Sequence, residues 1–320
     1  MIKNSSLRRI MVASFALVVV ILSVYLFPKN EVKIPSKTIY KRVNTCAIYL
    51  LDKNDYVSRT TINIDAKEKE AKAIELINAL INGTNKNKYL PEGFSSYIPN
   101  GTLINDLSIK DDLITINFNK NFLNIKNLRE EKMIESLVYT LTEIDGIKYV
   151  KILVDDEELT KLPISGKNIP PILDRSIGIN RKIKSNSFKN TQDVTTFFIN
   201  NYTNTTYYIP VTITTDKINE KIEIIIKELE SKDNIDSNLS TYIATGTVLQ
   251  NYQILENEFN LEFNNLIFNS FGDIDEDVVY GLALSIKENY DIDKISIDVG
   301  NKQIKSYALK NSWKTINNVI

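Results

Sequence analysis

Acidic side chains are the residues that could do chemistry in this chain, since it has no His and a single Cys. This composition excludes Ser-His-Asp and Cys-His catalysis, an internal disulfide, and nearly all zinc or transition-metal sites. Asp273, Asp275 and Asp277 have the spacing with which a calcium loop begins. Val278 and Leu284 stand where that loop needs Gly and Glu. We therefore predict neither a metal site nor a cofactor.

Two pairs of acids could in principle cleave glycosides, because that reaction needs only two carboxylates. Glu130 with Glu131, and Glu276 with Asp277, stand where we expect first turns of helices. The positive end of the helix dipole favours acids there without any catalytic role. No Gly-rich phosphate loop is present either. We predict that the chain is not an enzyme, and glycan cleavage remains an open alternative.

The chain contains one small domain twice. Residues 97–102, Tyr-Ile-Pro-Asn-Gly-Thr, return 145 positions later as residues 242–247, Tyr-Ile-Ala-Thr-Gly-Thr. The same offset relates Ile-Asn-Phe-Asn at 116–119 to Leu-Glu-Phe-Asn at 261–264. A constant offset through turns, strands and a helix indicates a tandem duplication. A duplicated module without chemistry indicates binding or assembly.

Hydrophobic periodicity predicts the order ββαββαβ in each copy. In the first copy we expect strands over 46–51, 59–64, 103–109, 113–118 and 149–154, and helices over 67–82 and 128–144. In the second we expect strands over 195–199, 208–214, 248–255, 258–263 and 294–299, and helices over 218–229 and 276–290. Two helices per copy fit one face of a mixed sheet, which gives the α+β class with two two-layer modules.

An apolar run near the N-terminus predicts a membrane segment. Residues 10–27 are uncharged, and a helix of this length spans about 27 Å, enough for a bilayer core. Lys3, Arg8 and Arg9 precede the run, so the N-terminus should be cytoplasmic and the bulk of the chain extracytoplasmic. A cleaved signal peptide is the alternative, but residues 23–25, Ser-Val-Tyr, make a poor cleavage site. We expect an uncleaved single-pass anchor in the cell membrane.

These observations divide the chain into six parts with uneven charge. They are a cytoplasmic stub with the anchor (1–28), a tether (29–45), the first domain (46–159), a basic Pro-containing linker (160–192), the second domain (193–300) and a tail (301–320). The linker carries seven basic side chains and one acidic, whereas the second domain carries 6 Lys and 19 acids. Acidic modules make nucleic-acid binding improbable.

Five segments of the first copy stand in a specific order and spacing. They are residues 76–83 (Leu-Ile-Asn-Ala-Leu-Ile-Asn-Gly), 98–102 (Ile-Pro-Asn-Gly-Thr), 114–119 (Ile-Thr-Ile-Asn-Phe-Asn), 138–143 (Val-Tyr-Thr-Leu-Thr-Glu) and 150–155 (Val-Lys-Ile-Leu-Val-Asp). Through these segments the copy resembles the GerM domain of spore-forming bacteria. The second copy matches more loosely, at 244–247 and 283–286.

The resemblance implies a protein of sporulation and germination, exported to the mother-cell side of the space around the forespore. Such modules are similar in fold to the ring-building motifs of secretion and sporulation machines. They support the channel complex between mother cell and forespore. Tandem members are often lipoproteins, whereas this chain has no lipid-acceptor Cys directly after its apolar run. Its attachment would therefore be the N-terminal helix.

Two groups of residues are candidates for contact with partners. The first is the turn Pro99, Asn100, Gly101 and Thr102, and the second is the basic set Arg175, Arg181, Lys182 and Lys184 of the linker. One hypothesis is that the linker of one molecule docks on the acidic second domain of a neighbour, which would give self-association. We expect protein–protein contacts with envelope or sporulation membrane proteins. Binding or modifying the cell wall is the alternative function.

Overall fold

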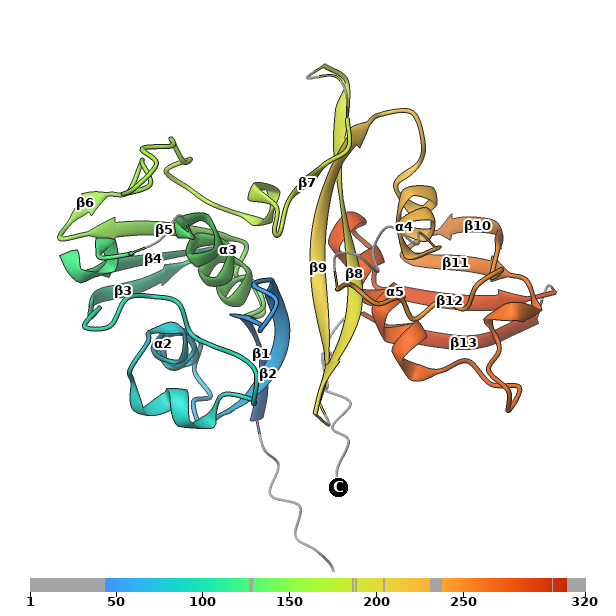
Figure 1. Cartoon of the computed structure of the whole chain (residues 1–320), viewed down its shortest axis with the longest axis horizontal. Helices are drawn as coiled ribbons and strands as arrows, with labels where there is room; N and C mark the ends of the chain where they lie inside the picture. The colour runs from blue at the N-terminus through green and yellow to red at the C-terminus, as the bar shows by residue number, and fades with distance from the viewer. Residues whose placement is uncertain are drawn as a thin grey trace, which may run out of the picture. The chain divides into compact units, whose positions relative to one another are not determined.

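The computed structural model describes residues 44–309, apart from 127–128, 186, 188, 204, 231–237 and 301 (Figure 1). The predicted membrane segment, residues 10–27, lies outside this part. Within it, no helix is both long enough and apolar enough to cross a bilayer. The anchor therefore stays a prediction.

Both copies follow the predicted element order. The first contains β1 (Asn44–Leu51), β2 (Val57–Ile64), α2 (Lys69–Leu80), β3 (Ile104–Lys110), β4 (Leu113–Phe118), α3 (Glu130–Leu141), β5 (Tyr149–Val154) and β6 (Glu157–Glu158). The linker adds a short 3-10 turn, η3 (Arg175–Ile177), and β7 (Lys182–Ile183). The second contains β8 (Thr191–Tyr202), β9 (Thr205–Asp216), α4 (Lys221–Glu230), β10 (Leu249–Leu255), β11 (Glu258–Phe263), α5 (Glu276–Asn289), β12 (Lys294–Val299) and β13 (Lys302–Ala308).

The later strands of each copy form a four-stranded mixed sheet, in the orders β3-β4-β5-β6 and β10-β11-β12-β13. β4 and β5 are parallel, as are β11 and β12, whereas the outer pairs are antiparallel. A parallel pair needs a long crossover connection. The helices α3 and α5 supply it, because each lies between the two parallel strands in the sequence. The predicted mixed α+β class with tandem modules is confirmed.

The prediction of one mixed sheet per module is wrong for the first hairpin of each copy. The hairpins β1–β2 and β8–β9 are not part of the mixed sheet of their own copy. They form a shared central sheet in the order β1-β2-β9-β7, with β8 paired to β9 (Figure 1). β8 and β9 pair over 12 residues each, longer than the predicted 195–199 and 208–214. The pairing continues beyond the predicted ranges at both ends of the hairpin. The added residues at the tip, such as Asn200, Asn201 and Thr206, are polar, which is typical of a loop, but here they continue the two strands.

Each copy encloses its own hydrophobic core. The first is built from the inner faces of α2, α3 and the adjacent strands, and the second from α4, α5 and theirs. Phe118 and Phe263, which are related by the offset of 145, are both 0% exposed. The duplication therefore extends from the sequence into the packing.

Candidate functional site at the junction of the two copies

Hydroxyl side chains of α3 and α5 form hydrogen bonds with the two outer strands of the central sheet, β1 and β8. In the first copy, the backbone N–H of Tyr49 donates to Thr140 Oγ1 at 3.0 Å, and the Ser136 hydroxyl donates to the Tyr49 carbonyl. In the second, Ser285 stands at the position equivalent to Thr140, and its Oγ accepts from the N–H of Phe197 at 3.0 Å. A hydroxyl on the equivalent turn of α3 and α5 therefore satisfies backbone groups that an edge strand otherwise exposes.

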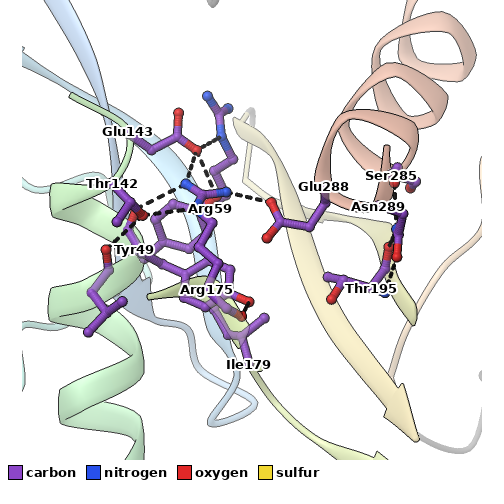
Figure 2. Close-up of polar contacts among 12 residues, drawn as sticks. Tyr49, Arg59, Thr142, Glu143, Arg175, Ile179, Thr195, Ser285, Glu288 and Asn289 are labelled. Carbon is purple, nitrogen blue, oxygen red and sulfur yellow. Dashed lines mark hydrogen bonds and ion pairs between the residues drawn. The ribbon is translucent and has the colours of Figure 1, made fainter. Parts of the chain in front are cut away.

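Arg175 of the linker joins equivalent glutamates of the two copies. Its Nη2 donates to Glu143 Oε1 at 2.9 Å, and its Nη1 donates to Glu288 Oε2 at 2.5 Å. Figure 2 shows Arg175 between these two carboxylates. Glu143 and Glu288 are one offset of 145 apart, and each side chain is only 8% exposed. The guanidinium of Arg175 thus pairs with a carboxylate at the equivalent position of each domain.

A second buried cation, Arg59 of β2, completes the charge cluster. Its Nε lies 3.5 Å from Glu143 Oε1, and its Nη1 donates to the Tyr280 hydroxyl of α5 at 2.8 Å. Burial would raise the pKa of Glu143, but Arg59 and Arg175 outweigh it and hold that pKa well below its ordinary value. The carboxylate is therefore ionised throughout the physiological range and bound on both sides.

Asn180 of the linker joins the facing strands of the two hairpins. Its Nδ2 donates to the carbonyls of Val57 in β2 and Pro210 in β9, both at 2.8 Å. Its Oδ1 accepts from the N–H of Val57 at 2.9 Å. A further contact crosses the junction where the Tyr207 hydroxyl donates to Asp52 Oδ2 at 3.2 Å. The linker is therefore a structural part of the junction in addition to connecting the copies.

The basic linker residues meet acids of the second domain of their own chain. Arg175 pairs with Glu288, Arg181 with Asp193, and Lys184 with Glu228. Lys182 lies in β7, which is parallel to β9. The predicted complementarity between linker and second domain thus occurs within one molecule. The hypothesis that a neighbour provides the acidic surface stays a prediction.

The candidate turn Pro99–Thr102 is held by side chains that recur in both copies. Gly101 has φ +82° and its equivalent Gly246 has φ +88°, a conformation that favours glycine. The Asn119 amide donates to the Gly101 carbonyl at 3.1 Å, and the Asn264 amide donates to the Gly246 carbonyl at 2.9 Å. Because both copies share these bonds, they have a structural purpose. Asn100 and Gly101 are exposed and Pro99 is half-buried, whereas Thr102 is buried and is not placed to contact a partner. Contact of the exposed part of the turn with a partner remains a prediction.

We expect Asn119→Ala to lower the free energy of unfolding by about 1–2 kcal/mol, because it removes the hydrogen bonds of this side chain to the Gly101 carbonyl and to the N–H of Leu103. Asn119 Oδ1 also accepts from the N–H of Leu103 at 3.1 Å. Urea unfolding of the full chain measures the change. Asn257→Ala is the matched control, since that exposed side-chain amide bonds only the Asp293 carboxylate among the described contacts. Equal losses in the two variants would contradict the role given to Asn119.

Glu135 of α3 gives the junction a dependence on pH. Burial raises its pKa to about 7, and its Oε2 accepts from the N–H of Asn180 at 3.0 Å. Between its ordinary pKa and 7 the folded chain keeps a proton that the unfolded chain releases, so stability falls as pH rises through that window. We expect Glu135→Gln to stabilise the chain at pH 8 but not at pH 4, as measured by thermal unfolding. An equal effect at both pH values would contradict this assignment.

A cleft of about 820 Å³ opens beside the junction. Arg59, Thr60 and Thr61 line it from β2, and Thr205, Thr206 and Tyr208 line it from β9. Ser240, Thr241 and Tyr242 also line it, as do residues 275–278 at the start of α5. Among the described residues no group of three or more His, Cys, Asp or Glu side chains is placed to hold a metal ion. The lining combines hydroxyls, aromatic rings and carboxylates with the Arg59 guanidinium and a few apolar side chains.

Sequence reasoning missed Glu143, Glu288 and Asn180, which are central to the junction. One signal was available for the glutamates, since an acid recurs at the same position near the end of both helices. No pattern marks Asn180, because its partners in β2 and β9 are 123 and 30 residues away. A contact of this kind depends on how the two hairpins meet.

Comparison with known proteins agrees with this architecture. Residues 47–160 match the family model described as "Germane: Sporulation and spore germination". The spore germination protein GerM of Bacillus subtilis (strain 168) is 29% identical over 263 residues, which cover 80% of this chain and 71% of that protein. The solved structure of its tandem GerMN domains matches with a TM-score of 0.73 at 29% identity, over 81% of this chain and 92% of that chain. Its first GerMN domain alone matches at 30% identity with a TM-score of 0.39, over 42% and 98% respectively.

Proposed function

We propose a function for this chain from its membership in the GerM domain family, of which it carries two tandem copies. That membership supports a role in sporulation. Our proposal is that the chain acts there without catalysis, as a membrane-anchored extracytoplasmic protein that contacts other proteins. An envelope assembly such as the mother cell–forespore channel complex is the setting we propose.

The junction is the observation that carries this proposal. Its buried charges, Arg59, Glu143, Arg175 and Glu288, are bound to one another or to Tyr280. Such an arrangement fixes two domains side by side, so that both present their surfaces to a partner together. Two linked binding surfaces raise the effective concentration of each for its partner, so weak contacts add up.

Deletion of the gene in its spore-forming host tests this function. We expect normal vegetative growth and a reduced yield of heat-resistant spores, restored by the full chain. A version without residues 1–28 is expected to restore the yield only when another membrane anchor replaces them. Unchanged spore formation in the deletion strain would contradict the proposal, and rescue by the unanchored version would contradict its membrane attachment.

Cell-wall binding is a second candidate, favoured by the lining of the cleft. The hydroxyl groups of Thr61, Thr206 and Ser240 suit sugar hydroxyls, and the half-buried ring of Tyr242 suits a sugar face. Sedimentation of the full chain with purified cell wall distinguishes the two candidates. Co-sedimentation that is equal for vegetative and sporulating wall would favour this second function over partner contact.

A further inference from the structure

The backbone direction of β2 determines which of its N–H and carbonyl groups face β9. The N–H and the carbonyl of Val57 both bond to the Asn180 side chain, so they point from β2 toward β9. Backbone groups alternate in direction along a strand with a period of two. The N–H and carbonyl of Arg59 and Thr61 therefore also point toward β9, away from β1.

The backbone groups of β9 also alternate in direction. The N–H of Thr212 donates to the Ile179 carbonyl at 2.8 Å, and the Pro210 carbonyl accepts from Asn180 at 2.8 Å. The register of β9 with β8 is unbroken, so Tyr208 and Thr206 also direct their backbone groups toward β2. The two inner strands thus present facing edges.

These edges pair at one place and then separate. The described pairing of β2 with β9 consists of Arg59 with Tyr208. The next pair of an antiparallel ladder would be Thr61 with Thr206, and both residues line the cleft instead. At the other end of the strands, the carboxamide of Asn180 fills the gap between Val57 and Pro210. The separated edges therefore form a slot, of which Thr61 and Thr206 are the sides.

The charge of the cleft wall indicates what the slot would accept. Asp275, Glu276 and Asp277 are exposed on that wall, and none of the described ion pairs includes them. The one guanidinium in the lining, Arg59, is bound to Glu143 and Tyr280. Asp277 accepts a hydrogen bond from the Tyr208 hydroxyl at 3.0 Å and Asp275 accepts one from the Asn269 amide at 2.5 Å, but neither neighbour carries a positive charge. Open strand edges accept extended backbone, and exposed carboxylates outside the described ion pairs favour a basic ligand.

We propose that this slot binds an extended basic segment of a partner protein, which adds a strand between Thr61 and Thr206 and completes the central sheet. The proposal rests on the proposed function, for which it supplies the class of partner and the place of contact. Main-chain hydrogen bonds to both edges hold the segment in register, and its Lys or Arg side chains meet the acids at the start of α5.

Thr206→Pro tests the slot because it removes one N–H that faces it. Pro210 occupies the same face of the same strand, so β9 already accommodates a proline in this direction. Thr206→Ala is the matched control, since it removes the side chain but keeps the N–H. Thermal unfolding of both variants checks that the fold is retained.

The probe is a fluorescent peptide of alternating Lys and Val, about six to ten residues long, which is the length of an ordinary strand. We expect it to bind the full chain in detergent, and its Glu–Val counterpart to bind more weakly. Thr206→Pro should weaken binding of the Lys–Val peptide about five- to tenfold, whereas Thr206→Ala should not. Glu276→Gln should weaken it to a smaller extent.

Three results would overturn the proposal. The first is equal binding of the Lys–Val peptide, or none, by the unchanged chain and Thr206→Pro. The second is binding of soluble peptidoglycan fragments in the cleft without binding of the peptide, which would assign the cleft to a glycan. The third is peptide binding that requires removal of residues 310–320, which would make the tail of the chain itself the occupant. Normal spore formation by Thr206→Pro, despite lost peptide binding, would separate this site from the proposed function.

Discussion

Arg175→Ala is expected to lower the free energy of unfolding of the full chain by about 3–5 kcal/mol, the usual loss when one partner of a buried ion pair is removed. The substitution leaves Glu143 and Glu288, each 8% exposed, without the guanidinium that lies between them. It also removes the bond from Arg175 Nε to the Thr142 hydroxyl at 2.8 Å and the contact of the guanidinium with the Tyr139 ring at 4.8 Å. Chemical denaturation at neutral pH measures the loss.

Lys167→Ala is the control for Arg175→Ala. Lys167 also belongs to the linker and also pairs with a glutamate, Glu131, at 2.9 Å. Both of those side chains are more than half exposed, so we expect a loss below about 1 kcal/mol. Replacing the second carboxylate, with Glu288→Gln in the Arg175→Ala chain, should recover part of the stability, because the remaining carboxylate, Glu143, keeps Arg59 as its partner. Similar small losses for Arg175 and Lys167 would show that the cluster does not hold the junction.

Phe118→Ala and Phe263→Ala are each expected to cost about 3–5 kcal/mol, because each removes a fully buried ring from one core. Phe118 stacks on Phe122 with ring centres 4.4 Å apart, and Phe263 lies in the core of the second copy. The copies share the central sheet and the Arg175 cluster, so we expect one cooperative unfolding transition, which either substitution moves as a whole. Differential scanning calorimetry of the two variants measures this.

The comparison of these two variants is self-controlled, because the residues are equivalent and lie in different copies. Two separate transitions, of which each substitution moves only one, would mean that the copies unfold independently. In that case the junction would not contribute enough free energy to couple the domains. Combining each substitution with Arg175→Ala should separate the transitions if the cluster is the main link.

Much of the fold within each copy follows from the sequence. The helices and strands have clear periods, and the constant offset of 145 predicts that Phe118 and Phe263 occupy the same place in two similar cores. The Gly101 turn is predictable as well, because Asn-Gly favours the positive φ that the structure shows. Local propensity decides these features.

The junction follows from the sequence far less well. The pairing of β2 with β9 rests on one residue pair, Arg59 with Tyr208, and hydrophobic alternation does not specify which hairpin edges meet. Arg175 reaches partners 32 and 113 residues away, and in the sequence it resembles any other basic side chain of the linker. Net charge led to the hypothesis that the linker docks on the acidic second domain of a neighbouring molecule. Net charge did not indicate that the linker would pair with the second domain of its own chain, as it does in the structure.

Recovery of partners from cells shows whether the chain acts by protein contact during sporulation. The measurement is affinity purification of the tagged full chain from detergent-solubilised membranes of sporulating and of vegetative cells, followed by mass spectrometry. If the chain acts by protein contact in sporulation, envelope proteins made during sporulation should be enriched only from sporulating cells. Recovery of cell-wall material alone, to the same extent from both kinds of cell, would contradict the account.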